Sequence, residues 1–206
     1  MAAIVRPSFI HVPADYLEVL PLAALFPVCQ PVEVELGSGD GSFMAAYAKS
    51  HPETNFVGVE RLLGRLRKLD RKAGRAELSN LRLIRIEASY FVEFMLPKEE
   101  ITALHLYFPD PWPKRRHHKN RLVNERFPGV VAHCLKPGGT VYLRTDNRPY
   151  FDQMLECFGA ARAFEAIETP ADLKGFTTDF ERGFNARGIP TLHAAYRKLP
   201  GGNVPG

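Results

Sequence analysis

The sequence predicts a doubly wound α/β fold, with a mainly parallel, seven-stranded sheet and an antiparallel edge near the carboxyl terminus. Short apolar runs alternate with segments of helical periodicity along most of the chain, which is the pattern of strand–helix–strand crossovers. A glycine-rich segment at residues 35–41 follows the first apolar run and precedes an amphipathic segment, as in the first strand-to-helix turn of such folds.

Five strands and four helices are expected to alternate first. The strands are predicted at residues 32–36, 55–60, 81–87, 103–108 and 140–145. The helices between them are predicted at residues 42–50, 62–74, 121–135 and 150–158. Two further strands, 164–168 and 191–199, should pair as the antiparallel edge, and the long polar loop between them shows no convincing helix.

One domain with short flanking segments is expected, because 206 residues with 45% hydrophobic content can bury one sizeable core and little more. Residues 31–199 should form this domain, residues 1–30 an N-terminal extension and residues 200–206 a flexible tail. Five apolar residues of the extension suit docking on the core or a dimer contact equally well, so a homo-oligomer stays possible but undetermined. They are Leu17, Val19, Leu20, Leu22 and Leu25.

Cysteine usage and hydropathy bound the class of protein. Cys29, Cys134 and Cys157 are far apart and lack paired spacing, so neither a disulfide framework nor a zinc or other metal site is expected. A reducing cytoplasm fits this usage. No secretory signal pattern and no apolar stretch long enough to span a bilayer occur, so no membrane partner is expected.

Positive charge is concentrated in two patches. The net charge is +4, and twelve of the 27 lysines and arginines lie in residues 61–75 and 114–121. Such patches favour a polyanionic partner. In the first patch the basic positions recur at helical spacing, so an ordinary solvated helix face explains it equally well.

A rigid loop precedes the second patch. Three prolines in residues 109–113 fix φ and remove backbone donors, so this segment cannot be a helix or a central strand. The loop carries Asp110 and Trp112. The tryptophan could stack on a base, or it could pack under the loop as a wedge.

A site for a nucleoside cofactor is predicted at the carboxyl ends of the strands. The glycines let the backbone approach a ligand closely, although a tight structural turn would use them too. Glu60 ends the second strand and can accept from both ribose hydroxyls. The residues expected to converge at this edge are Glu35, Gly37, Glu60, Glu87 and Asp110.

The glycine spacing separates the possible cofactors. The segment reads G-x-G-x-G, with Ser42 in place of the third glycine of a dinucleotide site, and a Walker A loop is absent. The Glu35 carboxylate suits a cationic ligand and would repel a pyrophosphate. S-adenosylmethionine is therefore favoured over a nicotinamide dinucleotide.

Five motifs of the chain occur together in one known family. They are Glu35-Leu-Gly-Ser-Gly39, Gly58-Val-Glu60, Tyr107-Phe-Pro-Asp-Pro-Trp-Pro-Lys114 with Arg116-His117, Thr145-Asp-Asn147 and Thr178-Asp-Phe-Glu181. Over residues 30–198 the chain resembles the bacterial tRNA (guanine-N7)-methyltransferases. The Phe-Pro-Asp-Pro-Trp run is the most specific of these motifs, since most class I methyltransferases share the glycine turn.

The resemblance implies a Rossmann-like class I methyltransferase fold and methyl transfer from S-adenosylmethionine to N7 of guanosine 46 in the variable loop of tRNA. The implied cofactor residues are Glu35, Gly37, Gly39, Glu60, Glu87 and Asp110, with Asp110 also in the catalytic role. The implied substrate residues are Lys114, Asp146, Thr178 and Glu181, with Arg116 and Lys119 gripping phosphate. Two departures are Glu87, where the family commonly has Asp, and Asp179, where Lys or Asn is commoner.

The chemistry needs no general base, because guanine N7 carries an in-plane lone pair. The protein must align N7 with the methyl group, and an acceptor carboxylate, Asp110 or Glu181, can hold the N1–H and N2–H edge of the base. Asp146 could bind substrate or cap the next helix, and Arg148 and Tyr150 are equally ambiguous. Three alternatives remain: a dehydrogenase, a methyltransferase acting on an exocyclic amine, and a non-catalytic RNA-binding module.

Overall fold

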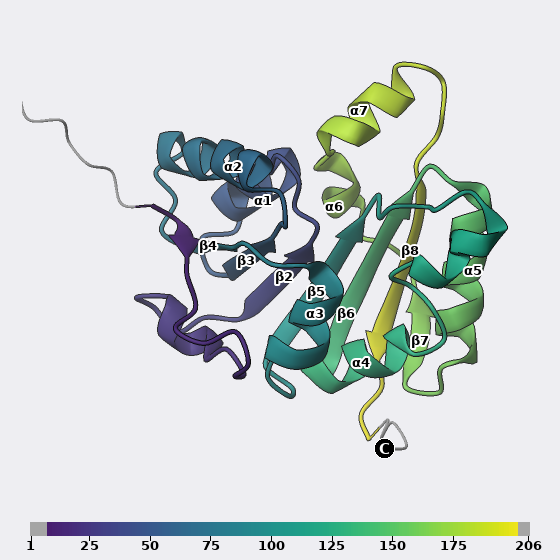
Figure 1. The fold of residues 1–206 in the computed structure, drawn as a ribbon, viewed down its shortest axis with the longest axis horizontal. Helices are drawn as coiled ribbons and strands as arrows, with labels where there is room; N and C mark the ends of the chain where they lie inside the picture. Colours follow the sequence, from purple (N-terminus) through teal and green to yellow (C-terminus); the bar gives the residue numbers. More distant parts are fainter. Residues whose placement is uncertain (1–7, 202–206) are drawn as a thin grey trace, which may run out of the picture.

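One twisted sheet of eight strands forms the centre of the molecule, with helices on both of its faces (Figure 1). The computed structural model of the chain describes residues 8–201. The strand order is β1-β4-β3-β2-β5-β6-β8-β7, and all neighbours are parallel except the pairs β6–β8 and β7–β8. This arrangement confirms the predicted fold class, including the antiparallel edge.

Most residues of the central strands are buried, as expected for parallel strands that are covered on both faces. These strands are β2 (Val32–Leu36), β3 (Asn55–Val59), β4 (Leu81–Ile84), β5 (Ile101–Tyr107) and β6 (Leu135–Thr145). The edge strands are β7 (Phe164–Ile167) and β8 (Leu192–Lys198). The eighth strand, β1 (Ile10–His11), pairs with β4 and is too short to produce a sequence pattern, so the predicted count of seven was one too low.

Two sets of helices cover the sheet. On one face lie α1 (Ser42–Ser50), α2 (Leu63–Arg75) and α6 (Ala171–Gly175). On the other lie α3 (Ala88–Tyr90), which continues as a wider turn through Met95, α4 (Phe127–Cys134) and α5 (Arg148–Ala160). The last helix, α7 (Asp179–Asn185), stands with α6 above the carboxyl-terminal edge of the sheet (Figure 1).

Two helix predictions were wrong. The helix expected at residues 121–135 begins only at Phe127, because residues 121–126 form turns and Pro128 fits the first turn of a helix. The loop before the last strand, expected to lack helices, contains α6 and α7. A capping box begins α7: the Thr178 side chain accepts from the Glu181 amide, and the Glu181 side chain accepts from the Thr178 amide.

The segment before β2 belongs partly to the main core. Leu20, Leu22 and Leu25 are buried against the sheet, and the Leu20 amide donates to the Met95 carbonyl at 2.8 Å. Leu17 is 82% exposed, so the apolar residues of this segment divide between core and surface. Most of the predicted tail, residues 202–206, lies outside the described part of the chain, as do residues 1–7.

Candidate active site

The glycine turn after β2 has the backbone geometry that the sequence predicted. Gly37, Gly39 and Gly41 have φ angles of 75°, 57° and 74°, a region that disfavours other residues. A Cβ atom on Gly41 would lie 2.1 Å from the Leu69 side chain, so this glycine lets α2 pack against the turn. Gly37 has no atom within 4 Å of its Cβ position, so its open side is free for a ligand.

Glu60, at the end of β3, fixes the shape of this turn. Its carboxylate is 5% exposed, accepts from the Gly39 amide at 3.1 Å and accepts from the Leu62 amide at 2.7 Å. Buried carboxylates with several N–H donors are held in one orientation. Glu60 therefore joins the turns after β2 and β3.

A cavity of about 400 Å³ opens at the carboxyl ends of β2 to β5. Four predicted cofactor residues line it, each following a different strand: Gly37, Glu60, Glu87 and Asp110. This is the crevice in which open α/β sheets bind ligands. Gly39 and Glu35 do not line the cavity, and Gly39 instead gives its amide to Glu60.

Glu35 lies in the sheet behind the turn, only 3% exposed. Burial raises the pKa of its carboxyl group to about 8, although the nearby Arg144 guanidinium opposes this shift. Its Oε2 atom is buried and has no hydrogen-bond partner in the described part of the chain. An unpartnered buried oxygen below the turn is suited to a cationic group on a ligand.

Glu87 caps α3. Its carboxylate accepts from the Tyr90 amide at 2.9 Å and from the Ser89 hydroxyl. Burial alone would raise the pKa of Glu87, but these hydrogen bonds outweigh it and lower the pKa below its usual range. The carboxylate is therefore charged and oriented at the rim of the cavity.

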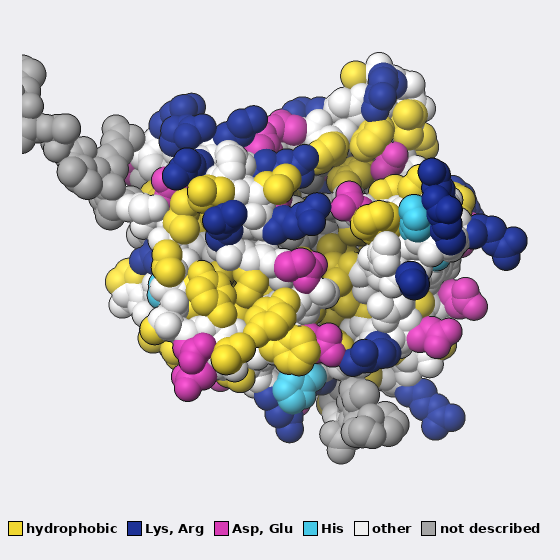
Figure 2. Space-filling model, in the orientation of Figure 1, with side chains coloured by type: hydrophobic (Ala, Val, Ile, Leu, Met, Phe, Trp, Pro, Cys, Tyr) yellow, Lys and Arg dark blue, Asp and Glu magenta, His cyan; other side chains and the backbone are white. Residues whose placement is uncertain are grey.

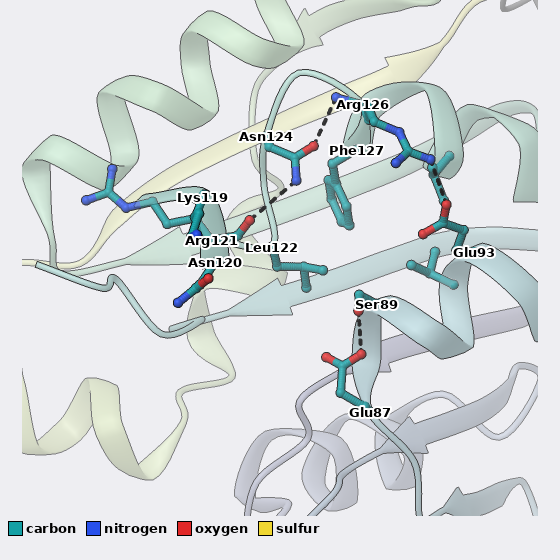
Figure 3. A pocket seen from close by; sticks show the side chains of 12 residues that line it. Glu87, Ser89, Glu93, Lys119, Asn120, Arg121, Leu122, Asn124, Arg126 and Phe127 are labelled. Atoms are coloured by element: carbon teal, nitrogen blue, oxygen red, sulfur yellow. Dashed lines mark hydrogen bonds and ion pairs between the residues drawn. The ribbon is translucent and has the colours of Figure 1, made fainter. Parts of the chain in front are cut away.

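A second pocket of about 340 Å³ adjoins the first and shares Glu87, Asn120 and Leu122 with it. Figure 3 shows Glu87 on one side of this pocket and Asn120 and Lys119 on the other. Arg126 and Glu93 also line this pocket and form an ion pair, with 2.7 Å between Arg126 Nη2 and Glu93 Oε1. The predicted phosphate-gripping Lys119 thus lies at the rim of this second pocket, beside the predicted cofactor site.

The proline-rich loop after β5 is neither helix nor strand, as predicted, and its backbone is strained. Phe108 and Trp112 have φ angles of 50° and 43°, which are rare for residues other than glycine. The Phe108 amide donates to the Arg144 carbonyl at 2.8 Å. Arg121 donates from Nε to the Pro111 carbonyl at 2.7 Å. Such strain persists only where the surroundings enforce it, often at functional sites.

Arg121 belongs to the cationic run of residues 114–121 in the sequence, but it is buried. It is 4% exposed, and besides Pro111 it contacts Gln153 of α5, with 2.6 Å between Arg121 Nη1 and Gln153 Oε1. Its guanidinium also lies over the Tyr150 ring. Arg121 therefore anchors the proline-rich loop to α5 and does not contribute to the exposed patch.

Asp110 and Trp112 project from this loop. Asp110 is exposed and forms no side-chain hydrogen bond or ion pair with any residue in 8–201. Trp112 is 36% exposed and lines the cavity, with its ring edge-on to His117. This placement favours the stacking interpretation of Trp112 over a wedge under the loop.

Exposed cations flank the cavity on two sides. On the turn after the loop, Lys114, Arg115, Arg116 and Lys119 are exposed. On α2 the exposed face carries Arg65, Arg67, Lys68, Arg71 and Arg75, with Arg61 just before the helix, while Leu66, Leu69 and Ala73 are buried. Figure 2 shows basic side chains over α2 and, across a hollow, near the loop that follows β5. The two patches therefore share one face with the cavity.

Thr178 and Glu181 have partners inside the protein. The Thr178 hydroxyl accepts from the Glu181 amide at 3.0 Å. Glu181 is 3% exposed and accepts from Arg144 Nη1 at 3.1 Å. Arg144 itself was not predicted as a site residue, although a charged residue inside the apolar run of β6 was a signal for a buried polar contact.

Of the four polar residues at positions 146–150, after β6, only Asp146 lacks a structural role in the described part of the chain. Asn147, rather than Asp146, caps α5, because its side chain accepts from the Tyr150 amide at 3.0 Å. Asp146 is half-buried and has no side-chain partner among the described residues. Arg148 forms a surface ion pair with Asp152, and Tyr150 is fully buried, so neither belongs to the cleft.

Asp179, where the family commonly has Lys or Asn, connects α7 to its neighbours. Its amide donates to the Ser42 hydroxyl at 2.9 Å, and its carboxylate lies 3.7 Å from Lys72 Nζ. It also pairs with Arg182. The carboxylate therefore links α7 to α2, whereas the link to α1 is made by the backbone amide.

No helix in residues 8–201 is long and apolar enough to cross a membrane. Within the same range, no group of three or more His, Cys, Asp or Glu side chains is arranged to hold a metal ion.

The family model described as "Putative methyltransferase" matches residues 29–192. The tRNA (guanine-N(7)-)-methyltransferase of Thiobacillus denitrificans is 38% identical over 182 residues, covering 87% of this chain and 78% of that protein. The enzyme of the same name from Geobacter metallireducens is 32% identical and covers 96% of this chain and 93% of that protein.

Solved structures support the fold. The 16S rRNA methyltransferase KamB superposes with a TM-score of 0.61 at 16% identity, covering 83% of this chain and 89% of that one. A structure described as an antibiotic-related methyltransferase has a TM-score of 0.58 at 16% identity and covers 93% of this chain and 96% of that one. Likeness at this identity concerns the fold alone.

The extent of the sequence identity, together with the cavity built from four strand ends, leads to one assignment: the chain belongs to the tRNA (guanine-N7)-methyltransferase family.

Proposed function

We propose that the protein transfers a methyl group from S-adenosylmethionine to N7 of guanosine 46 in the variable loop of tRNA, in the cytoplasm, giving 7-methylguanosine and S-adenosylhomocysteine. The observation that carries this proposal is the convergence of Glu60, Glu87 and Asp110 on one cavity flanked by exposed cations. The reaction and the tRNA substrate are inferred from membership of the family.

The residues present fit S-adenosylmethionine, which supplies a methyl group on a sulfonium cation. In this proposal Glu60, held by two amides, accepts from ribose hydroxyls, and Glu87 lies farther along the same rim. The unpartnered oxygen of Glu35 suits the cationic amino acid end. A dinucleotide is a poorer fit, because its pyrophosphate would meet the carboxylates of Glu60 and Glu87, which line the cavity.

Asp110 is the best candidate to hold the guanine. Its carboxylate has no other partner and lies at the cavity. It accepts from N1–H and N2–H of the base, orients N7 toward the methyl group, and its charge stabilises the cationic 7-methylguanine. Glu181 is less suited to this role, because its carboxylate already pairs with Arg144.

The exposed cations grip the tRNA backbone. Lys114, Arg116 and Lys119 follow the Asp110 loop at once, so they contact phosphates near the target nucleotide. Displacing a stacked base costs a few kcal/mol, which these contacts and stacking on Trp112 offset. Asp146 and Thr178 complete the proposed substrate set on the basis of the resemblance, since neither lines the cavity itself.

A transfer assay with radiolabelled S-adenosylmethionine tests the target. A tRNA transcript with guanosine 46 and a matched transcript with adenosine at that position are compared. We expect methyl incorporation only into the first. Equal incorporation into both would contradict the assignment of position 46, while the atom that carries the methyl group distinguishes N7 chemistry from transfer to an exocyclic amine. Absence of cofactor binding would favour a non-catalytic RNA-binding module.

A further inference from the structure

Arg144 is buried at the centre of the molecule, on β6 close to the candidate site. Its side chain is 1% exposed. The guanidinium donates from Nη2 to the Leu173 carbonyl at 2.6 Å and from Nη1 to the Phe176 carbonyl, also at 2.6 Å. It also donates from Nη1 to Glu181 at 3.1 Å. These acceptors belong to α6, to the residue that ends it, and to α7, so one side chain holds the whole hairpin of residues 171–185.

The backbone of the same residue holds the proline-rich loop. The Arg144 carbonyl accepts from the amide of Phe108, the strained residue two positions before Asp110. The Phe108 ring in turn stacks near Phe184 and Phe180 of α7, with centroid distances of 5.7 and 6.4 Å. Arg144 therefore joins the loop that carries Asp110 to the hairpin that carries Thr178.

The charges around Arg144 come from two sides. Glu181 pairs with it directly, and the second oxygen of Glu181 lies 3.9 Å from His193 Nε2. Burial, followed by the Arg144 charge, lowers the pKa of His193. On the cofactor side, Arg144 acts electrostatically on Glu35, and the rings of Tyr107 and Phe43 lie 4.2 and 5.5 Å from its guanidinium carbon.

We propose that Arg144 is a positioning residue for methyl transfer, which fixes the hairpin of residues 171–185 against the Asp110 loop and so shapes the tRNA side of the cleft. This inference rests on the proposed function. The arrangement needs arginine, because its acceptors lie in different directions and a planar guanidinium with five donors reaches them together. Lysine keeps the charge but concentrates its donors at one point.

The first test is Arg144→Lys, which keeps the positive charge near Glu35. We expect kcat/KM for tRNA to fall by about tenfold or more, since small displacements of binding groups have effects of this size. The dissociation constant for S-adenosylhomocysteine should change by less than about threefold, because Glu60 and Glu87 keep the backbone amides that donate to them. Backbone amides of residues 171–185 should exchange with deuterium faster than in the wild type.

Lys198→Met is the matched control. Lys198 is also a buried cation, 5% exposed, and donates to the Leu135 carbonyl at 2.7 Å and to Glu99 at 3.0 Å, away from the hairpin. A general loss of stability should therefore appear in both variants, whereas the selective loss of kcat/KM should appear only in Arg144→Lys. The proposal would be overturned if the melting temperature, the affinity for S-adenosylhomocysteine and kcat/KM for tRNA fell to the same extent in both variants.

Should Arg144→Lys fail to fold, Arg144→Met combined with Glu181→Met removes both charges and leaves no buried ion unpaired. Glu181→Gln alone, measured beside it, separates the loss of the Glu181 carboxylate that caps α7 from the loss of Arg144. We expect this double variant to fold, with faster exchange in residues 171–185 and reduced kcat/KM for tRNA. A hairpin as protected as in the wild type, or wild-type kcat/KM in either variant, would contradict a positioning role. If the wild-type protein proves inactive on tRNA, the proposed function fails, while hairpin exchange still reports whether Arg144 holds this segment.

Discussion

The two sides of the cleft are built differently. On the cofactor side, the carboxylates of Glu60 and Glu87 accept hydrogen bonds from the backbone and each has one orientation. On the tRNA side, Lys114 and Lys119 are exposed and have no side-chain partner among residues 8–201. A small ligand requires fixed donors and acceptors, whereas a polyanion requires charge whose placement can adapt.

This difference predicts how each side responds to mutation. Changing one group on the cofactor side breaks specific hydrogen bonds, so single substitutions should have large effects. Changing one cation on the tRNA side removes one of several screened contacts, so effects should be moderate, roughly additive and dependent on salt. Asp110 belongs to neither side alone, because it is exposed and yet lines the cavity.

The largest effect is expected for Asp110→Asn. The amide keeps the shape but loses the charge and one acceptor, so kcat should fall by about 100-fold or more. Affinity for S-adenosylhomocysteine should fall by less than about tenfold. Single-turnover methyl transfer and calorimetric titration measure the two quantities. Asp152→Asn, an exposed aspartate on α5, is the control, and an unchanged kcat in Asp110→Asn would remove Asp110 from the catalytic role.

Glu60→Ala tests the cofactor side alone. The amides of Gly39 and Leu62 lose their common acceptor, so the turn loosens and S-adenosylhomocysteine should bind about 10- to 100-fold more weakly. The KM for tRNA at saturating cofactor should stay close to the wild-type value. Glu77→Ala, at an exposed position just beyond α2, is the control. If S-adenosylhomocysteine bound more weakly and the KM for tRNA rose by the same factor, the two sides of the cleft would not be separate.

The tRNA side is tested by combining Lys114→Ala, Arg116→Ala and Lys119→Ala. Cofactor affinity should be unchanged, while tRNA binding weakens and the slope of log Kd against log salt falls by about 2 to 3. Filter binding at several salt concentrations gives both values. The control is the triple variant Lys49→Ala, Lys98→Ala and Lys136→Ala. These residues are exposed and lie near the amino ends of the strands, away from the cavity. Equal slopes in the two triple variants would place the tRNA elsewhere.

The smallest effect concerns pH and Glu35. Because burial raises the pKa of Glu35 to about 8, the folded state holds a proton that the unfolded state releases above its ordinary pKa of 4.5. The stability due to this group is complete below pH 4.5 and is lost as pH rises through 8. Between pH 7 and 9 the loss should be about 1 kcal/mol. Urea denaturation at several pH values should show this slope in the wild type and not in Glu35→Gln.

Much of the fold could be predicted because local patterns agree with it. Residues 32–36 and 42–50 form a strand and a helix as predicted, since apolar alternation and the following glycine turn indicate the same boundaries. The rule that ligands bind beyond strand ends also predicts that Glu60, Glu87 and Asp110 lie at one site, and all three line the same cavity.

One missed feature is a local pattern, and the others depend on contacts between distant segments. Thr178 and Glu181 were assigned to substrate from the resemblance, and their spacing as a capping box for α7 was overlooked. Arg121 and Arg144 read as ordinary cations because their partners are mainly backbone carbonyls far along the chain. No local pattern indicates such partners.

The identity of the methylated nucleoside tests the proposed function most directly. The purified protein is incubated with labelled S-adenosylmethionine and unmodified tRNA, the tRNA is digested to nucleosides, and the labelled product is identified by mass spectrometry, with Asp110→Asn in parallel. The proposed function predicts 7-methylguanosine with the wild-type protein and little or none with the variant. A methyl group on any other atom, or equal product from the two proteins, would contradict it.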